Sequence, residues 1–184
     1  MKPGIRSILP FLVAALFLVF GLDRVDAQQR GNDSPRVSPN ASVSQTIGTT
    51  ILQVTYGRPS DRGRTIFGDL VPYRQVWRTG ANESTVITFS DPVTIEGERV
   101  EAGTYSLYTI PGEDEWVIIL NEKLSWGTQY DESEDLLRVR VQPGQAPHQE
   151  QFLIYFDEVD ETSGTLLIHW ARTKVPVQIV VDTN

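Results

Sequence analysis

From about residue 41 onward, apolar and polar side chains alternate with a period close to two, in short runs separated by turn residues. The run LLRVRV (136–141) is an example: Leu137, Val139 and Val141 share one face, and two arginines share the other. A period of two places alternate side chains on opposite faces of an extended strand, whereas a helix needs a period near 3.6. The pattern therefore predicts half-buried antiparallel strands.

Runs of this kind recur through the rest of the chain, and turn signals such as Glu96-Gly97 and Pro111-Gly112 separate them. The expected strands are 52–56, 85–90, 93–95, 99–100, 104–110, 116–120, 136–141, 152–156, 165–170 and 175–181. Many short strands with frequent turns predict an all-β, antiparallel β-sandwich of jelly-roll-like type. The apolar run 116–120 is typical of a strand buried on both faces, and only 65–71 and 131–137 suit short helical turns.

The first 27 residues have the pattern of a secretory signal peptide. Lys2 and Arg6 precede an unbroken run of ten apolar residues (11–20), and Ala27 ends a plausible cleavage site. A membrane-spanning helix needs about 20 apolar residues, so we expect cleavage and no stable membrane insertion; the alternative is an uncleaved N-terminal anchor. The polar segment 28–40 is expected to be a flexible linker, and 41–184 to form a single domain. The expected location is periplasmic or secreted.

Composition excludes several classes of function. With 16 Lys and Arg against 24 Asp and Glu, the net charge of −8 argues against nucleic-acid binding. The absence of cysteine removes thiolate catalysis and Cys-zinc sites. His148 is expected in a solvated loop and His169 in a strand, half-buried, so they give a weak metal signal, and we expect neither a metal nor a cofactor.

Residues 57–83 differ from the rest of the chain, because they interrupt the strand pattern for about 25 residues and are locally basic. Long connections of this kind are usually functional or disordered, and the apolar residues within this one predict an ordered loop. Arginine side chains beside aromatic rings suit planar anions, and the rings suit sugar faces. The candidate ligand-binding residues are Arg58, Arg64, Tyr73, Trp77, Arg78, Asn82 and Glu83.

Three alternatives stay open at this point. Arg58 and Arg64 can instead pair with acidic residues of the same loop, with Trp77 as part of the core, because internal ion networks resemble sites. An envelope hydrolase is the second alternative, with Asp69 or Glu83 in a cleft and a raised pKa. A structural assembly protein, associating through sheet edges near Pro176, is the third.

The acidic clusters 131–135 and 157–161 are interpreted as solvated turns, with calcium binding as the lesser alternative.

Several strings in the chain resemble a known family. They include Tyr56-Gly57-Arg58-Pro59, Leu70-Val71-Pro72-Tyr73, Val76-Trp77-Arg78-Thr79-Gly80-Ala81-Asn82-Glu83 and Ala102-Gly103-Thr104-Tyr105-Ser106-Leu107. The chain from about 38 to 182 resembles a domain-of-unknown-function family of exported bacterial proteins. The resemblance implies a periplasmic or secreted β-rich domain, and it supplies no activity or catalytic residue. The preferred hypothesis is a non-catalytic module that binds an anionic or carbohydrate-like ligand, in an oligomeric state that the sequence leaves open.

Overall fold

The computed structural model describes residues 30–31 and 34–182, and the expected signal peptide (1–27) lies outside these residues. The described residues form ten strands. They are β1 (Asn40–Ile47), β2 (Thr50–Gly57), β3 (Thr85–Phe89), β4 (Val93–Ile95), β5 (Glu98–Val100), β6 (Gly103–Ile110), β7 (Trp116–Asn121), β8 (Asp135–Val141), β9 (Gly144–Asp157) and β10 (Ser163–Val181). A 3₁₀ turn, η1 (Glu132–Glu134), precedes β8.

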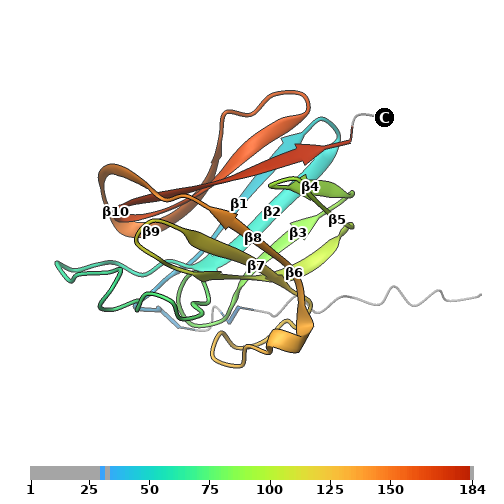
Figure 1. The fold of residues 1–184 in the computed structure, drawn as a ribbon. Coiled ribbons are helices and arrows are strands. Elements are labelled where there is room, and N and C mark those ends of the chain that lie inside the picture. Colours follow the sequence, from blue (N-terminus) through green and yellow to red (C-terminus); the bar gives the residue numbers. More distant parts are fainter. Residues whose placement is uncertain (1–29, 32–33, 183–184) are drawn as a thin grey trace, which may run out of the picture.

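The strands form two antiparallel sheets packed face to face, so the predicted all-β sandwich is confirmed (Figure 1). The larger sheet has six strands in the order β1-β2-β3-β6-β7-β8, and the smaller has four in the order β5-β4-β10-β9. The larger sheet therefore follows the chain order, except where β4 and β5 cross to the other layer. Within the described residues no helix is long and apolar enough to cross a bilayer.

The apolar faces of the two sheets meet in one core, as the alternation predicts. In β8 the three apolar residues Leu137, Val139 and Val141 are buried, and the arginines between them are exposed. The run at β7 is buried on both faces, as expected. Its outer neighbours on β6 are covered by the 122–134 connection, where Tyr130 packs on Tyr108 with ring centroids 5.0 Å apart.

The C-terminal strand differs from the expectation, because the two predicted strands 165–170 and 175–181 form one strand of 19 residues. β10 pairs with β9 through residues 165–174 and with β4 through 179–181. Pro176 lies between these paired stretches, so its missing N–H costs no ladder hydrogen bond. The strand bends at Ala171, where φ is +51° and the register with β9 shifts.

The segment between β2 and β3 is ordered, but it contains no helix. The helical turn expected at 65–71 is not confirmed, because Phe67 and Val71 form an isolated bridge there and the residues between them form a turn. The expected turn within 131–137 is present as η1, after which Asp135 begins β8. Figure 1 shows the 58–84 segment and the 122–134 connection at the same end of the sandwich, near residues 34–39.

Candidate functional site

The 58–84 segment, which we call the basic loop, is pinned to the sandwich at both ends by backbone hydrogen bonds. Near its start the Phe152 N–H donates to the Pro59 carbonyl, and Ser60 pairs with Gln151 of β9. Near its end Trp77 forms an antiparallel bridge with Thr109, with N···O distances of 2.7 and 2.9 Å. The basic loop thus adds a short paired stretch to each sheet, at Ser60 and at Trp77. These two attachments fix the positions of the side chains between them.

Trp77 joins the basic loop to the core through aromatic contacts. Its ring lies 6.0 Å from that of Trp170 in a stacked arrangement, and 5.2 Å from that of Phe152 edge to face. Phe67 and Trp116 complete the group, with centroids 5.9 and 6.3 Å from Trp77. Aromatic pairs at these distances add about 0.5–1.5 kcal/mol each beyond burial. Trp77 is therefore both part of the core and, on its partly exposed side, available to a pocket.

The backbone at Thr79 and Gly80, directly after Trp77, is held by side-chain hydrogen bonds and lies close to β2. The Trp77 Nε1 donates to the Gly80 carbonyl at 3.1 Å, and the Thr85 hydroxyl donates to the Thr79 carbonyl at 2.6 Å. Gly80 has a φ of +155°, and a Cβ there would lie 2.9 Å from the Gly57 carbonyl oxygen. The backbones of β2 and the loop therefore approach too closely for any side chain at this position.

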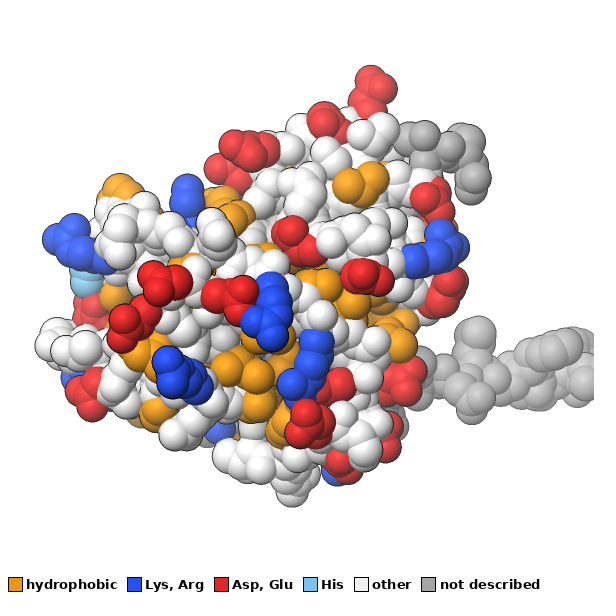
Figure 2. All heavy atoms as spheres, viewed as in Figure 1, with side chains coloured by type: hydrophobic (Ala, Val, Ile, Leu, Met, Phe, Trp, Pro, Cys, Tyr) orange, Lys and Arg blue, Asp and Glu red, His pale blue; other side chains and the backbone are white. Residues whose placement is uncertain are grey.

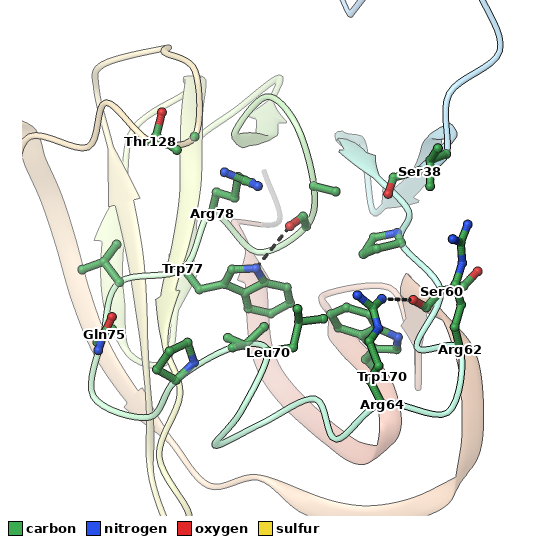
Figure 3. Close-up of a pocket in the computed structure, with 18 of the residues that line it drawn as sticks. Ser38, Ser60, Arg62, Arg64, Leu70, Gln75, Trp77, Arg78, Thr128 and Trp170 are labelled. Atoms are coloured by element: carbon green, nitrogen blue, oxygen red, sulfur yellow. Dashed lines mark hydrogen bonds between the residues drawn. The ribbon is translucent and has the colours of Figure 1, made fainter.

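A pocket of about 600 Å³ opens between the basic loop, the N-terminal segment and the 122–134 connection. Trp170 lines it from β10, and Trp77 and Leu70 lie between Arg78 on one side and Arg62 and Arg64 on the other (Figure 3). The full lining consists of Val37, Ser38, Pro59, Ser60, Arg62, Arg64, Leu70, Val71, Pro72, Gln75, Val76, Trp77, Arg78, Gly80, Ala81, Gly127, Thr128, Tyr130 and Trp170. The volume lies within the usual range of small-molecule sites, about 300–1,000 Å³.

The pocket is positively charged, although the protein as a whole is acidic. Acidic side chains are spread widely over the face of the molecule in Figure 2, but the pocket lining includes three arginines and no carboxylate among its described residues. Within the described part of the chain, the salt bridges involve other residues and none of these three arginines. None of the three arginines therefore forms an ion pair within the described residues, although the charge of Arg64 acts on nearby Asp61.

Arg64 and Arg78 are held in place without being neutralised. Arg64 donates from Nε to the Asp61 carbonyl and from Nη2 to the Ser60 carbonyl, both at 2.8 Å. The stem of Arg78 lies against Gly127, where a Cβ would overlap its methylene carbons. The Nε of Arg78 is buried and has no hydrogen-bond partner within the described structure. A buried donor without a partner is costly, by about 1–3 kcal/mol, and such groups call for an explanation.

Four of the predicted site residues do not line the pocket. Arg58 donates from Nε to the Phe152 carbonyl and so has a structural role. Tyr73 lies outside the pocket and packs against Gly68, where a Cβ would lie 2.8 Å from its ring. Asn82 donates to the Ser38 carbonyl at 3.3 Å. Of the seven candidates the structure brings Arg64, Trp77 and Arg78 together, and it adds Arg62 and Trp170, which the site prediction omitted.

Glu83, the fourth residue, forms a buried ion pair that the sequence did not reveal. Its carboxylate accepts from Arg36 Nη1 at 2.8 and 2.9 Å, and Arg30 Nη1 lies 3.6 Å away. Burial raises the pKa of Glu83, but the hydrogen bond and the charges of Arg36 and Arg30 outweigh it, so the pKa is lowered. The hydrolase hypothesis requires a raised pKa in a cleft. Glu83 does not meet this requirement, and Asp69 is exposed outside the pocket.

A second cluster lies beside the pocket, where Asp61 of the basic loop meets His148 and Glu150 of β9. His148 was expected in a solvated loop, but it lies half-exposed in a strand, because β9 begins at Gly144. Its Nε2 is 3.0 Å from Asp61 Oδ2 and 3.9 Å from Glu150 Oε2. The Gly63 N–H, above all, lowers the pKa of Asp61, and the charges of His148 and Arg64 also contribute. These three residues could hold a metal ion.

Three further titratable residues have structural explanations. His169 is buried in β10, and its Nε2 lies 3.0 Å from the Pro147 carbonyl oxygen. In the turn between β9 and β10, Asp160 accepts hydrogen bonds from Thr162 and Ser163, which lower its pKa. Asp131 similarly caps η1 by accepting from the Ser133 N–H. These contacts are those of ordinary acidic turns.

Comparison with known proteins places the chain in a family. No curated protein and no solved structure matches it. The sequence pattern of a family described as "Protein of unknown function (DUF2911)" matches residues 38–179, which span the basic loop, the pocket and almost all of both sheets. The chain therefore belongs to the DUF2911 family of proteins of unknown function.

Proposed function

We propose that this protein is an exported, non-catalytic binding module that takes up an anionic ligand in the pocket beside Trp77. The observation that carries the proposal is the set of three arginines, Arg62, Arg64 and Arg78, around one pocket whose described lining holds no carboxylate. Guanidinium groups form short, charge-assisted hydrogen bonds with carboxylates, sulfates and phosphates, often two at a time. An anion in this pocket would give the three arginines an ion-pair partner, which none of them has within the described residues.

The orphaned Nε of Arg78 supports the same proposal. Its burial gives that N–H no access to bulk water, and the described residues offer it no acceptor. A rotation of this side chain on binding would bring the N–H to an oxygen of the bound anion, which is an acceptor of the right charge. The cost of leaving this donor unsatisfied in the free protein would then be recovered on binding.

The walls of the pocket indicate what the anion is attached to. Leu70 and Val76 are 43% and 38% exposed, so they offer apolar contact at the rim. The stacking of Trp77 on Trp170 covers part of the indole that would otherwise stack on a neutral sugar. We therefore favour a ligand with a carboxylate or sulfate on an apolar or sugar-like body, such as a uronic-acid oligosaccharide, over a neutral glycan.

Export is part of the proposal and rests on the sequence. The positively charged start and the apolar run 11–20 are typical of a signal peptide. A periplasmic or secreted location would expose the pocket to polysaccharides and other anions of the envelope.

The test is a calorimetric titration of galacturonic-acid oligomers, with galactose oligomers of equal length as the neutral comparison. We expect the acidic oligomers to bind and the neutral ones to bind at least tenfold more weakly. Adding salt should weaken binding, because ionic contacts are screened. Arg78→Ala should abolish most of the binding, and Arg78→Lys should restore only part of it, since lysine lacks the planar fork.

The matched control is Arg140→Ala, which removes an exposed arginine that is paired with Glu115 and lies outside the pocket. This variant should bind as the wild type does. The proposal fails if sulfated, phosphorylated and uronic-acid probes all give no heat, or if Arg78→Ala and Arg140→Ala bind the acidic oligomer equally well.

A further inference from the structure

The cluster of Asp61, His148 and Glu150 has the composition of a metal site. Nitrogen from a neutral imidazole and oxygens from two carboxylates are donors that zinc accepts, whereas calcium and magnesium prefer oxygen alone. The two carboxylates carry a combined charge of −2, which a divalent cation balances. None of the three residues lines the pocket, although Arg62 and Arg64, which do line it, lie next to the cluster.

The fold fixes the relative positions of the three residues. His148 and Glu150 are two residues apart on β9, so their side chains leave the same face of the strand. Asp61 is placed opposite them, because its N–H donates to the Glu150 carbonyl at 2.9 Å. The cluster therefore sits where the basic loop continues the smaller sheet.

Each carboxylate uses one oxygen for a backbone N–H and turns the other toward His148. Asp61 Oδ1 accepts from the Gly63 N–H at 2.9 Å, and Glu150 Oε1 accepts from the Arg62 N–H at 3.1 Å. Oδ2 and Oε2 are the oxygens that face the His148 Nε2, at 3.0 and 3.9 Å. Metal sites commonly hold their ligands in this manner, with outer hydrogen bonds that orient each ligand.

The spacing also suits a metal ion. The ligand atoms of the three residues lie within 4.8 Å of one another. Zinc bonds of about 2.0–2.1 Å in tetrahedral geometry place ligand atoms roughly 3.3 Å apart, so small rotations of the half-exposed His148 and the exposed Glu150 are enough. We infer that Asp61, His148 and Glu150 bind a divalent transition metal of the zinc type, which fastens the basic loop to β9.

A neutral imidazole that binds a metal through Nε2 carries its proton on Nδ1. Three protein ligands leave at least one position of a four-coordinate zinc ion for water. The nearby charges of Arg62 and Arg64 weaken the site, because they repel a cation.

The experiment titrates Zn²⁺ into untagged protein that has first been dialysed against a chelator. We expect a single site by calorimetry. His148→Gln and Glu150→Gln should each weaken binding at least tenfold, the scale on which even outer-shell changes act. Zn²⁺ should raise the melting temperature of the wild type and leave that of His148→Gln unchanged.

The control is Glu158→Gln, because Glu158 is an exposed carboxylate in the acidic turn after β9. It should bind Zn²⁺ as the wild type does. Since His148 and Glu150 are exposed, their variants are expected to fold, and circular dichroism checks this. A wild type that binds no Zn²⁺ overturns the inference, as does binding that is unchanged in His148→Gln or lost in Glu158→Gln.

Discussion

Replacement of Trp77 by alanine tests whether the basic loop is packed rigidly on the sandwich. The change removes ring contacts with Trp170, Phe152, Phe67 and Trp116, and the hydrogen bond to the Gly80 carbonyl. A fully buried tryptophan costs about 3–5 kcal/mol when truncated. Trp77 is only partly buried, so we expect about 3 kcal/mol of lost unfolding free energy. For a domain of this size that corresponds to a fall in melting temperature of about 6–12 °C.

Trp126 provides the matched control, because it is 52% exposed and lies in the 122–134 connection. Exposed positions without special contacts usually change stability by less than about 0.5 kcal/mol. Both variants are compared with the wild type by differential scanning calorimetry and by urea unfolding. If Trp77→Ala and Trp126→Ala shift the melting temperature equally, the loop is not anchored through Trp77 and the reasoning is refuted.

Three further predictions concern the ion pair, the loop backbone and a surface charge. Glu83→Gln should destabilise the protein at pH 7 and make its unfolding free energy less dependent on pH in acid. The lowered pKa of Glu83 gives stability that is present above about pH 4.5 and is lost as the pH falls through the pKa of the folded state. Urea unfolding measured across pH 3–7 checks this. Gly80→Ala should cost about 1–3 kcal/mol, measured by thermal unfolding, since its Cβ meets the Gly57 carbonyl and its φ is +155°. Arg140→Ala should change stability by less than about 1 kcal/mol, because its ion pair is exposed; a larger loss in calorimetry would contradict this.

Most of the strands could be predicted from the sequence, because the alternation of apolar and polar residues within them indicates which face is buried. β1 and the first part of β9 were not predicted. Leu137, Val139 and Val141 alternate with arginines, and this local pattern is enough to assign both the strand and its buried face. The fusion of the two predicted strands into β10 was not predicted, because Pro176 is typical of an edge strand or of the start of a strand. Only the pairing of β10 with two different partners shows why proline is tolerated there.

The candidate site could be predicted only in part, since partners distant in sequence decide it. The concentration of arginines and Trp77 indicated a loop that lines the pocket, and Arg64 and Arg78 are among the lining residues. Glu83 was assigned to the ligand site, but its partner Arg36 comes from a segment that the sequence describes only as polar. No local signal distinguishes a carboxylate that meets a ligand from one that meets a distant arginine.

The Asp61–His148–Glu150 cluster could not be predicted for the same reason, because its members are distant in sequence. Asp61 and His148 are far apart in the chain, and they meet because Ser60 pairs with Gln151 across the edge of β9. The spacing of His148 and Glu150 places both side chains on one face of a strand. This spacing indicates a shared site only if the segment is a strand, and the sequence did not predict β9 to begin before residue 152.

An NMR titration tests most directly whether the pocket binds an anion, because it follows the arginine Nε–H and tryptophan Nε1–H resonances as galacturonic-acid oligomers are added. We expect the Nε–H signals of Arg64 and Arg78 to shift first, because these groups surround the pocket, and the Trp77 indole signal to shift with them. The Arg140 signal should stay in place. Shifts that centre on Arg140 while Arg64 and Arg78 do not move would contradict a binding role for the pocket.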